Sequence, residues 1–210
     1  MNIPFLDLQR QYALTQRELD TSIGNVMRSF RFIRGKEVDQ FENAFAGLLN
    51  LPNCTSTGNG TDSIFLALMG LGLKPGDEVI TPAFSWISSA ETISSCGATP
   101  VFVDVDPEFY TLDPPLIAEK ITPKTKGIIA VHLYGQAAPV REIKEHCNQH
   151  NLFLIEDCAQ AHLTMDANQP VGTIGNAGCF SFYPTKNLGA YGDAGCVVTA
   201  NKALAERIRR

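Results

Sequence analysis

The apolar residues of this chain follow two kinds of periodicity. Within residues 36–49, apolar side chains recur at steps of three, four and three residues and so share one helix face: Val38, Phe41, Phe45 and Leu48. Residues 11–28 also predict a helix. Beyond residue 51, short apolar runs predict strands at 54–57, 78–81, 101–105, 127–132, 152–156, 178–183 and 196–199. The segments between them predict helices at 61–70, 86–95, 114–120, 140–150 and 202–210.

Strands that alternate with helices predict a mainly parallel sheet with helices on both faces. The runs 127–131 and 152–155 are apolar without alternation, as expected of strands that are buried on both sides. The predicted fold class is therefore α/β, with three layers in the order helix, sheet, helix. In such sheets ligands bind beyond the carboxyl ends of the strands, so functional residues are expected there.

The composition narrows the classes of partner. The length of 210 residues suits one large domain or two small ones. With 17 Lys and Arg against 22 Asp and Glu, the net charge of -5 argues against a surface for nucleic acid or anionic membranes. No stretch reaches the roughly 18 consecutive apolar residues of a membrane span, and the first residues lack the pattern of a signal peptide. We therefore expect a cytoplasmic protein that binds neither nucleic acid nor membranes.

Six cysteines are scattered along the chain without a Cys-x-x-Cys pair, which predicts buried reduced thiols rather than a disulfide framework. His146 and His150 would share a helix face, but no Glu follows His146 and no further ligand cluster is present. We therefore expect no metal site.

The loop after the strand predicted at 54–57 is rich in glycine and begins a helix. Gly58 and Gly60 would let the backbone approach a ligand, and the N–H groups of the helix start would bind a phosphate. A capped helix start, with Asn59 or Thr61 as the capping residue, explains the segment equally well. The fingerprint of a dinucleotide-binding Rossmann fold is incomplete, because its third glycine position holds Ser63.

Two further segments place charged groups at predicted strand ends. Glu156 and Asp157 close a buried strand, where alternation points them in opposite directions. One of them is expected to face the site, unless they serve a structural ion pair. Lys186 begins a loop with three glycines and is enclosed by tyrosine, proline and leucine, which would withdraw it from water. A desolvated lysine can act as a nucleophile or form a Schiff base.

A phosphate site, a buried carboxylate and a reactive amine are the groups that pyridoxal phosphate requires. Its phosphate needs N–H donors, its pyridine nitrogen needs a carboxylate to stay protonated, and its aldehyde needs an amine. The three segments therefore predict pyridoxal phosphate as the cofactor.

Motifs along nearly the whole chain, in the same order, resemble those of one known family. They lie at residues 4–8, 35–42, 60–62, 76–82, 84–86, 102–105, 132–135 and 156–161 and in the loop that begins at Lys186. The family comprises the sugar aminotransferases of the DegT/DnrJ/EryC1/StrS group, which are fold type I pyridoxal-phosphate enzymes. So many motifs in one order make chance agreement implausible.

This resemblance implies a role for each motif residue. Lys186 would hold the cofactor as a Schiff base and Asp157 would bind the pyridine N–H, and these two are the expected catalytic residues. The other implied cofactor contacts are Gln160 to the ring hydroxyl, Trp86 stacked on the ring with Phe84 close by, Ser181 and the N–H groups of Thr61 and Asp62 to the phosphate, and Gly60 to allow the approach.

The family also implies a domain organisation and an activity. Residues 1–210 would form the large, cofactor-binding domain with an N-terminal helical segment, and the smaller C-terminal domain of such enzymes would be absent from this sequence. The implied activity moves an amino group from glutamate to a nucleotide-linked keto sugar, in a protein that is a homodimer when full length. Lys186 itself motivates this activity, because relatives that dehydrate sugars carry His at that position.

The loop at residues 183–193 bears on the position of amination. It resembles relatives that act at C2 or C3 of the hexose, whereas those acting at C4 tend to carry threonines in place of residues 188–190. Of the two we expect C3, on a dTDP- or UDP-linked hexose such as a dTDP-linked 3-keto-6-deoxyhexose, in the synthesis of cell-surface glycans or antibiotic sugars. Tyr183 and Tyr191 would lie against the sugar or pyrophosphate, or would only pack the loop.

Two other functions are compatible with this kind of sheet. A cofactor-binding regulatory protein without turnover would have the same architecture, although the presence of Lys186, Asp157 and Gln160 argues against decay of the site. A nicotinamide-dependent reductase is disfavoured by Ser63 and by the Lys186 loop.

Overall fold

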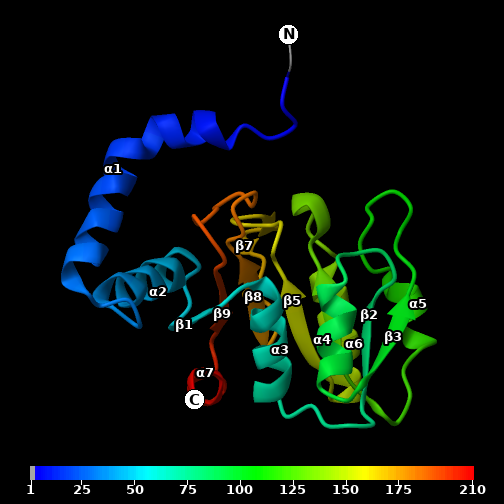
Figure 1. The fold of residues 1–210 in the computed structure, drawn as a ribbon. Helices are drawn as coiled ribbons and strands as arrows, with labels where there is room; N and C mark the ends of the chain where they lie inside the picture. Colours follow the sequence, from blue (N-terminus) through cyan, green and yellow to red (C-terminus); the bar gives the residue numbers. More distant parts are fainter. Residues whose placement is uncertain (1–2) are drawn as a thin grey trace. The chain divides into compact units, whose positions relative to one another are not determined.

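The computed structural model describes residues 3–210, and the chain divides into two compact units between Phe41 and Glu42. The first unit contains α1 (Leu8–Ser29) and the start of α2 (Lys36–Leu48), which confirms both predicted N-terminal helices (Figure 1). Asp7 caps α1, because its carboxylate accepts a hydrogen bond at 2.9 Å from an N–H of the first turn. No residue of α1 is buried.

The second unit is built around a seven-stranded sheet, and each strand predicted from the sequence is present (Figure 1). Its strands are β1 (Asn53–Thr57), β2 (Glu78–Pro82), β3 (Thr99–Val103), β4 (Thr125–Val131), β5 (Phe153–Asp157), β8 (Ala177–Ser181) and β9 (Gly195–Thr199). The order across the sheet is β1-β9-β8-β5-β4-β2-β3. Only β9 runs antiparallel to its neighbours, β1 and β8, so the prediction of a mainly parallel sheet is confirmed.

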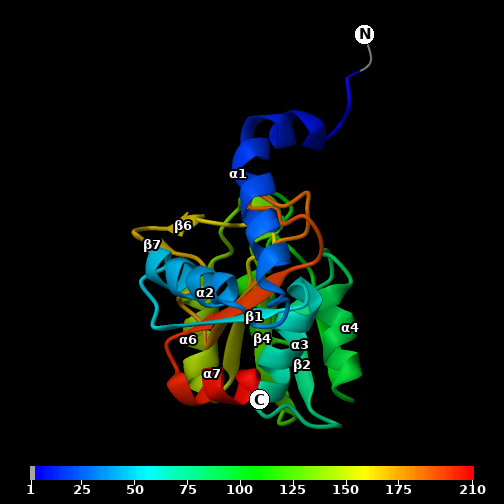
Figure 2. The ribbon, with the colours of Figure 1, turned by 60° about the vertical axis from the view of Figure 1, so that its left-hand side comes forward.

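Helices cover both faces of this sheet. They are α3 (Gly60–Gly70), α4 (Ser88–Ser95), α5 (Pro114–Ala118), α6 (Val140–His150) and α7 (Lys202–Arg209). On one face, α3, α4 and α7 bury Leu68, Ile93 and Leu204 against the strands. On the other face, α5 and α6 bury Ile117 and Ile143. Figure 2 shows α3 and α4 on one side of the sheet and α6 on the other, so the three-layer arrangement is confirmed.

Three short features escaped the sequence pattern. The two-residue strands β6 (Met165–Asp166) and β7 (Gln169–Pro170) form a small separate hairpin. Leu133–Gly135 form a 3₁₀ turn after β4. Segments of two or three residues are too short to show a periodicity, so they leave no apolar pattern to detect.

The cysteines are all free and buried, which confirms that prediction. Within residues 3–210, no helix is both long enough and apolar enough to cross a membrane. The same residues contain no group of three or more His, Cys, Asp or Glu side chains that could hold a metal ion.

Strand pairing brings the candidate segments to one edge of the sheet. Thr57 at the end of β1 and Ser181 at the end of β8 both pair with Gly195, the first residue of the antiparallel β9. Val131 at the end of β4 pairs with Asp157 at the end of β5. The loops that follow these strands therefore meet at the carboxyl edge of the sheet.

Candidate active site

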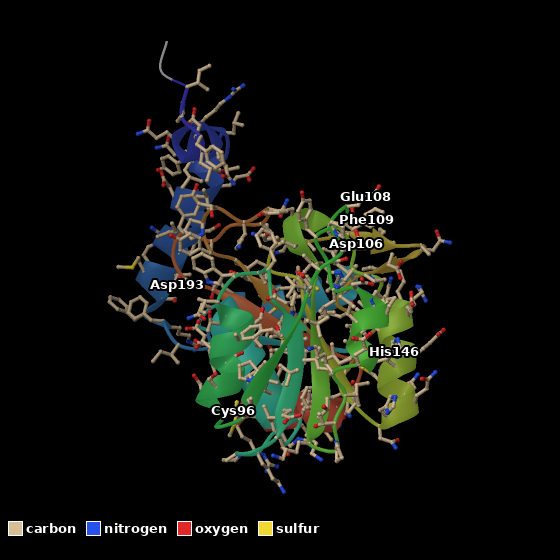
Figure 3. The ribbon with its side chains drawn as sticks, turned by 90° about the vertical axis from the view of Figure 1, so that its right-hand side faces the viewer. Cys96, Asp106, Glu108, Phe109, His146 and Asp193 are labelled. Atoms are coloured by element: carbon tan, nitrogen blue, oxygen red, sulfur yellow. The ribbon has the colours of Figure 1, made fainter. Side chains whose placement is uncertain are left out.

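A cavity of about 510 Å³ opens at this carboxyl edge, and its size is typical of small-molecule sites. It is lined by all but one of the proposed catalytic and cofactor-binding residues, namely Gly60, Thr61, Trp86, Asp157, Gln160, Ser181 and Lys186. The exception is Asp62. Asp193 also lines the cavity, and Figure 3 shows it toward the same end of the unit as Asp106 and Phe109, away from Cys96.

The start of α3 forms one wall of the cavity. Asn59 caps this helix, because its side-chain oxygen accepts the Asp62 N–H at 2.8 Å. The Asp62 N–H is therefore engaged within the helix start. Within the described chain, the structure records no acceptor for the N–H groups of Gly60 and Thr61. Those two N–H groups, at the positive end of the helix, can bind an anion.

Gly60 is required by the packing of α3 against β8. A Cβ atom at Gly60 would lie 2.6 Å from the Cβ atom of Ser181, which is closer than real side chains approach. The absence of a side chain therefore places the helix start directly beside the Ser181 hydroxyl. The sequence suggested that Gly60 makes room for a ligand, whereas its nearest neighbour is Ser181.

Asp157 faces the cavity and is only 5% exposed. Its carboxylate accepts a hydrogen bond from the Ala159 N–H at 3.0 Å and a longer one from the Ser89 hydroxyl at 3.4 Å. Burial raises the pKa of Asp157 above its usual value, because a charged carboxylate is poorly solvated there. A cation in the cavity would stabilise the ionised form.

Glu156 points to the opposite side of the strand, as alternation predicts, and forms the structural pair. Its carboxylate accepts hydrogen bonds from His132 Nε2 at 3.1 Å and from the N–H groups of Gly172, Ile174 and Gly175 at 2.8, 2.8 and 2.6 Å. Burial alone would raise the pKa of Glu156, but the hydrogen bond from His132 and the amide donors outweigh it and lower the pKa. The two interpretations of this pair of carboxylates therefore apply to different residues.

Gln160 is held by the turn that follows β4. Its Oε1 accepts the backbone N–H of Tyr134 at 2.8 Å, which fixes the orientation of the side-chain amide. Because Oε1 accepts this hydrogen bond, the NH₂ group of Gln160 points away from the turn. Gln160 therefore brings a hydrogen-bond donor to the cavity wall.

Lys186 lies in a compact loop at the end of β8 and is half-buried. Its N–H donates to the Tyr183 carbonyl at 2.8 Å, and the Ser181 hydroxyl accepts the Tyr183 N–H at 3.3 Å. A Cβ atom at Gly189 would collide with the carbonyl of Pro184, so this tight turn requires glycine. The His162 ring contacts the rings of Phe180 and Phe182, at centroid distances of 5.6 and 5.4 Å.

The structure distinguishes the two candidate stacking residues. Trp86 lines the cavity and remains 74% exposed. Phe84 is not among the lining residues and instead contacts the ring of Tyr110 at a centroid distance of 6.0 Å. Of the two, Trp86 is therefore the side chain that can cover a ligand bound here.

Sequence reasoning missed several polar groups around the cavity. Ser89 contacts Asp157, and the Ser88 hydroxyl lies 2.7 Å from that of Thr61 and so joins the starts of α3 and α4. Both serines lie at the start of the helix that follows Trp86, and this position was the only sequence signal that they could reach the cavity. The backbone of Tyr134 also contacts a site residue, and the only sequence signal for it was the motif at residues 132–135.

Known proteins resemble this chain over nearly its whole length. The model of the DegT/DnrJ/EryC1/StrS aminotransferase family matches residues 14–210. A pleiotropic regulatory protein of Geobacillus stearothermophilus is 45% identical over 100% of this chain and 56% of its own length. A UDP-N-acetyl-3-dehydro-alpha-D-glucosamine 3-aminotransferase of Acidithiobacillus ferrooxidans is 45% identical over 99% of this chain and 56% of its own length. The chain thus spans little more than half the length of these curated relatives.

Solved structures share the fold closely. DesV of S. venezuelae, in complex with a ketimine intermediate, superposes with a TM-score of 0.96 at 42% identity, over 99% of this chain and 56% of that one. NtdA of Bacillus subtilis, with its cofactor PMP bound, gives a TM-score of 0.93 at 34% identity, over 99% of this chain and 47% of that one.

Proposed function

Since the chain belongs to the DegT/DnrJ/EryC1/StrS aminotransferase family, which is pyridoxal-phosphate-dependent and includes nucleotide-sugar aminotransferases, we propose that this protein transfers an amino group from glutamate to a nucleotide-linked keto sugar. One observation carries the proposal. A single cavity brings Lys186 together with a buried carboxylate at Asp157 and with N–H groups at the start of α3 that have no recorded acceptor within residues 3–210.

The side chains of this cavity fit pyridoxal phosphate. Asp157 is a buried carboxylate with a raised pKa, and a protonated pyridine nitrogen would stabilise its ionised form. The N–H groups of Gly60 and Thr61 and the hydroxyl of Ser181 form a site for the phosphate. Gln160 offers an NH₂ donor, which suits the ring oxygen as an acceptor.

Each side chain has a distinct part in the proposed reaction. Lys186 would bind the cofactor covalently through Nζ and, once displaced by the amine of glutamate, would take the proton from the glutamate α-carbon. In the second half of the reaction, Lys186 Nζ would deliver a proton to the sugar carbon that receives the amine. Asp157 would keep the ring nitrogen protonated, and Trp86 would cover one face of the ring and exclude water. When bound, the cofactor supplies an electron sink for the carbanion that proton removal creates.

For the substrate we propose a hexose with a keto group at C3, linked to dTDP or UDP. The relative named for 3-amination of a UDP-linked 3-dehydro sugar supports this position. Tyr183 lines the cavity beside Lys186, where its ring can lie against a sugar. C2 is the second position to test.

We also propose a homodimer. α1 has 22 residues and none is buried, although Leu14, Ile23 and Met27 are among its exposed apolar side chains. A helix with apolar residues on its surface is stabilised when another chain covers them. Sedimentation of the full-length protein as a monomer at micromolar concentration would contradict this proposal.

Absorbance spectroscopy tests the cofactor, and product analysis tests the reaction. The purified protein with pyridoxal phosphate should show a visible band, which Lys186→Ala should abolish and Lys124→Ala, at an exposed lysine, should retain. Mass spectrometry with labelled glutamate and a panel of 2-, 3- and 4-keto nucleotide sugars should then find label in the 3-keto product. A band that survives Lys186→Ala, or amination of the 4-keto sugar alone, contradicts the respective part of the proposal.

A regulatory role without turnover is the second candidate, because one 45% identical relative is named a pleiotropic regulatory protein. Glutamate added to the protein without sugar separates the two functions. An aminotransferase should convert the bound cofactor to its amine form in a single turnover, whereas a regulatory protein should leave the visible band unchanged. Tight binding of NADH would instead favour the nicotinamide-dependent reductase.

A further inference from the structure

The turn that follows β4, residues 132–136, has a strained backbone beside the cavity. Tyr134 has a φ of 56° and Gly135 a φ of 85°, so two successive residues are in the left-handed region. For a residue with a side chain this conformation costs free energy and persists only where the surroundings impose it. The side chain of Tyr134 is 71% exposed, so its burial does not explain the conformation.

The backbone N–H of Tyr134, in contrast, is engaged in a hydrogen bond. This N–H donates to Gln160 Oε1 at 2.8 Å. Because an N–H can only donate, the amide of Gln160 cannot be rotated to exchange its oxygen and nitrogen without losing the bond. Within residues 3–210 the structure records no acceptor for Gln160 Nε2, although Gln160 lines the cavity. The turn thus leaves Nε2, a donor, for whatever binds there.

Two further contacts hold the turn in place. The Thr164 hydroxyl donates to the Gly135 carbonyl at 3.0 Å. His132, at the start of the turn, accepts the Ala138 N–H on Nδ1 at 3.0 Å, so Nε2 carries the hydrogen and donates to Glu156 at 3.1 Å. The Tyr134 N–H therefore lies between two positions of the turn, His132 and Gly135, that are each held by a hydrogen bond.

We propose that Thr164 is a positioning residue: by holding the turn 132–136, it fixes the Tyr134 N–H and so keeps the amide of Gln160 in one orientation. The inference rests on the proposed function, because the acceptor that it implies is the ring oxygen of pyridoxal phosphate. A donor draws negative charge from that oxygen and weakens its attraction for a proton at Lys186 Nζ. Loss of the donor should therefore raise the pH at which this proton leaves.

A pH titration of the visible absorbance of the cofactor-loaded protein tests the proposal without measuring activity. Gln160→Leu should raise the midpoint by about one pH unit, and Thr164→Val by about half a unit. In the double variant, Thr164→Val should add nothing to Gln160→Leu, because both act on one donor. Thr164→Ser keeps the hydroxyl and should restore the original midpoint.

Thr199→Val is the matched control. The Thr199 hydroxyl also donates to a backbone carbonyl, that of Asn176, at 2.7 Å, but Thr199 ends the antiparallel β9 at the opposite edge of the sheet. This variant should leave the midpoint unchanged, and circular dichroism should show each variant folded. Should valine at position 164 disturb folding, Thr164→Ala gives the same comparison.

Three results would overturn the proposal, and they are distinguishable. If Gln160→Leu raises the midpoint and Thr164→Val does not, Thr164 has no positioning role. If the double variant shifts further than Gln160→Leu alone, Thr164 acts on another group. If the unaltered protein forms no visible band with pyridoxal phosphate, the proposed function is wrong and the inference with it.

Discussion

Replacing Glu156 by glutamine would test how the end of β5 is held behind the cavity. Glu156 is fully buried, and each carboxylate oxygen accepts two hydrogen bonds. Oε1 accepts the N–H groups of Ile174 and Gly175, and Oε2 accepts that of Gly172 and the Nε2–H of His132. Glutamine has the same shape but only one acceptor oxygen, so its NH₂ group must face two donors in either orientation.

The cost follows from the number of donors that lose an acceptor. Two buried donors remain unpaired, and each costs about 1–3 kcal/mol, so the free energy of unfolding should fall by about 2–6 kcal/mol. Domains of this kind are stable by about 5–15 kcal/mol, so the variant should still fold in most of this range. The four hydrogen bonds to the Glu156 carboxylate are therefore expected to contribute a large part of the stability of this unit.

Urea unfolding followed by circular dichroism measures the difference. Glu145→Gln, at an exposed position of α6, is the matched control and should change the unfolding free energy by less than about 0.5 kcal/mol. The hydrogen bonds lower the pKa of Glu156, so its contribution is present above the unfolded value of about 4.3 and is lost as the pH falls through the folded value. The gap between wild type and Glu156→Gln should therefore narrow in acid.

A loss of less than about 1 kcal/mol at neutral pH would refute this reasoning. It would mean that the two donors left unpaired find other acceptors and that the hydrogen bonds to Glu156 do not hold the end of β5. A gap that stays constant into acid would show that the loss comes from packing rather than from charge.

Three further predictions concern the same unit. Gly60→Ala should lower the unfolding free energy by about 1–3 kcal/mol and weaken cofactor binding, because its Cβ would lie 2.6 Å from that of Ser181; Gly47→Ala, whose Cβ meets nothing within 4 Å, should be neutral or stabilising in the same urea titration. Burial lowers the pKa of His162, so its stabilising effect is present above the unfolded pKa of about 6.5 and is lost as the pH falls below 6.5. His162→Leu should therefore remove this part of the pH dependence of the urea midpoint. The thiols should resist a disulfide reagent until the chain unfolds, because all are buried and burial raises the pKa of Cys147 to about 12; rapid reaction of the native protein would contradict this.

The fold was largely predictable because its inner strands, such as β4, β5, β8 and β9, are buried on both faces. Such strands are continuous apolar runs with glycine and proline between them, and this signal is local in the sequence. The turn at 133–135 is different, because its shape depends on a contact with a distant residue. Tyr134, for example, is held by the side chain of Gln160, which lies 26 positions away in the chain. No local pattern can predict such a contact.

The site shows a second kind of limit, in which a rule is sound but leaves a choice. Alternation correctly separates Glu156 from Asp157, but it does not tell which one faces the cavity. That choice depends on the segments that lie beyond the ends of the neighbouring strands. The side of the sheet with α3 and α4 brings Ser89 to Asp157, while the other side brings His132 and the loop at 172–175 to Glu156.

The start of α3 shows why a cap and a phosphate site cannot be separated from sequence alone. Both interpretations use the N–H groups of the first helical turn, so they look like alternatives. In the structure the cap uses only one of these groups, because the side chain of Asn59 accepts the N–H of Asp62, while the N–H groups of Gly60 and Thr61 have no acceptor within the described residues. The cap therefore does not compete with an anion: it orders the turn that presents the two remaining donors. In the proposed phosphate site, Asp62 would therefore act through the order of the helix start rather than through its own N–H.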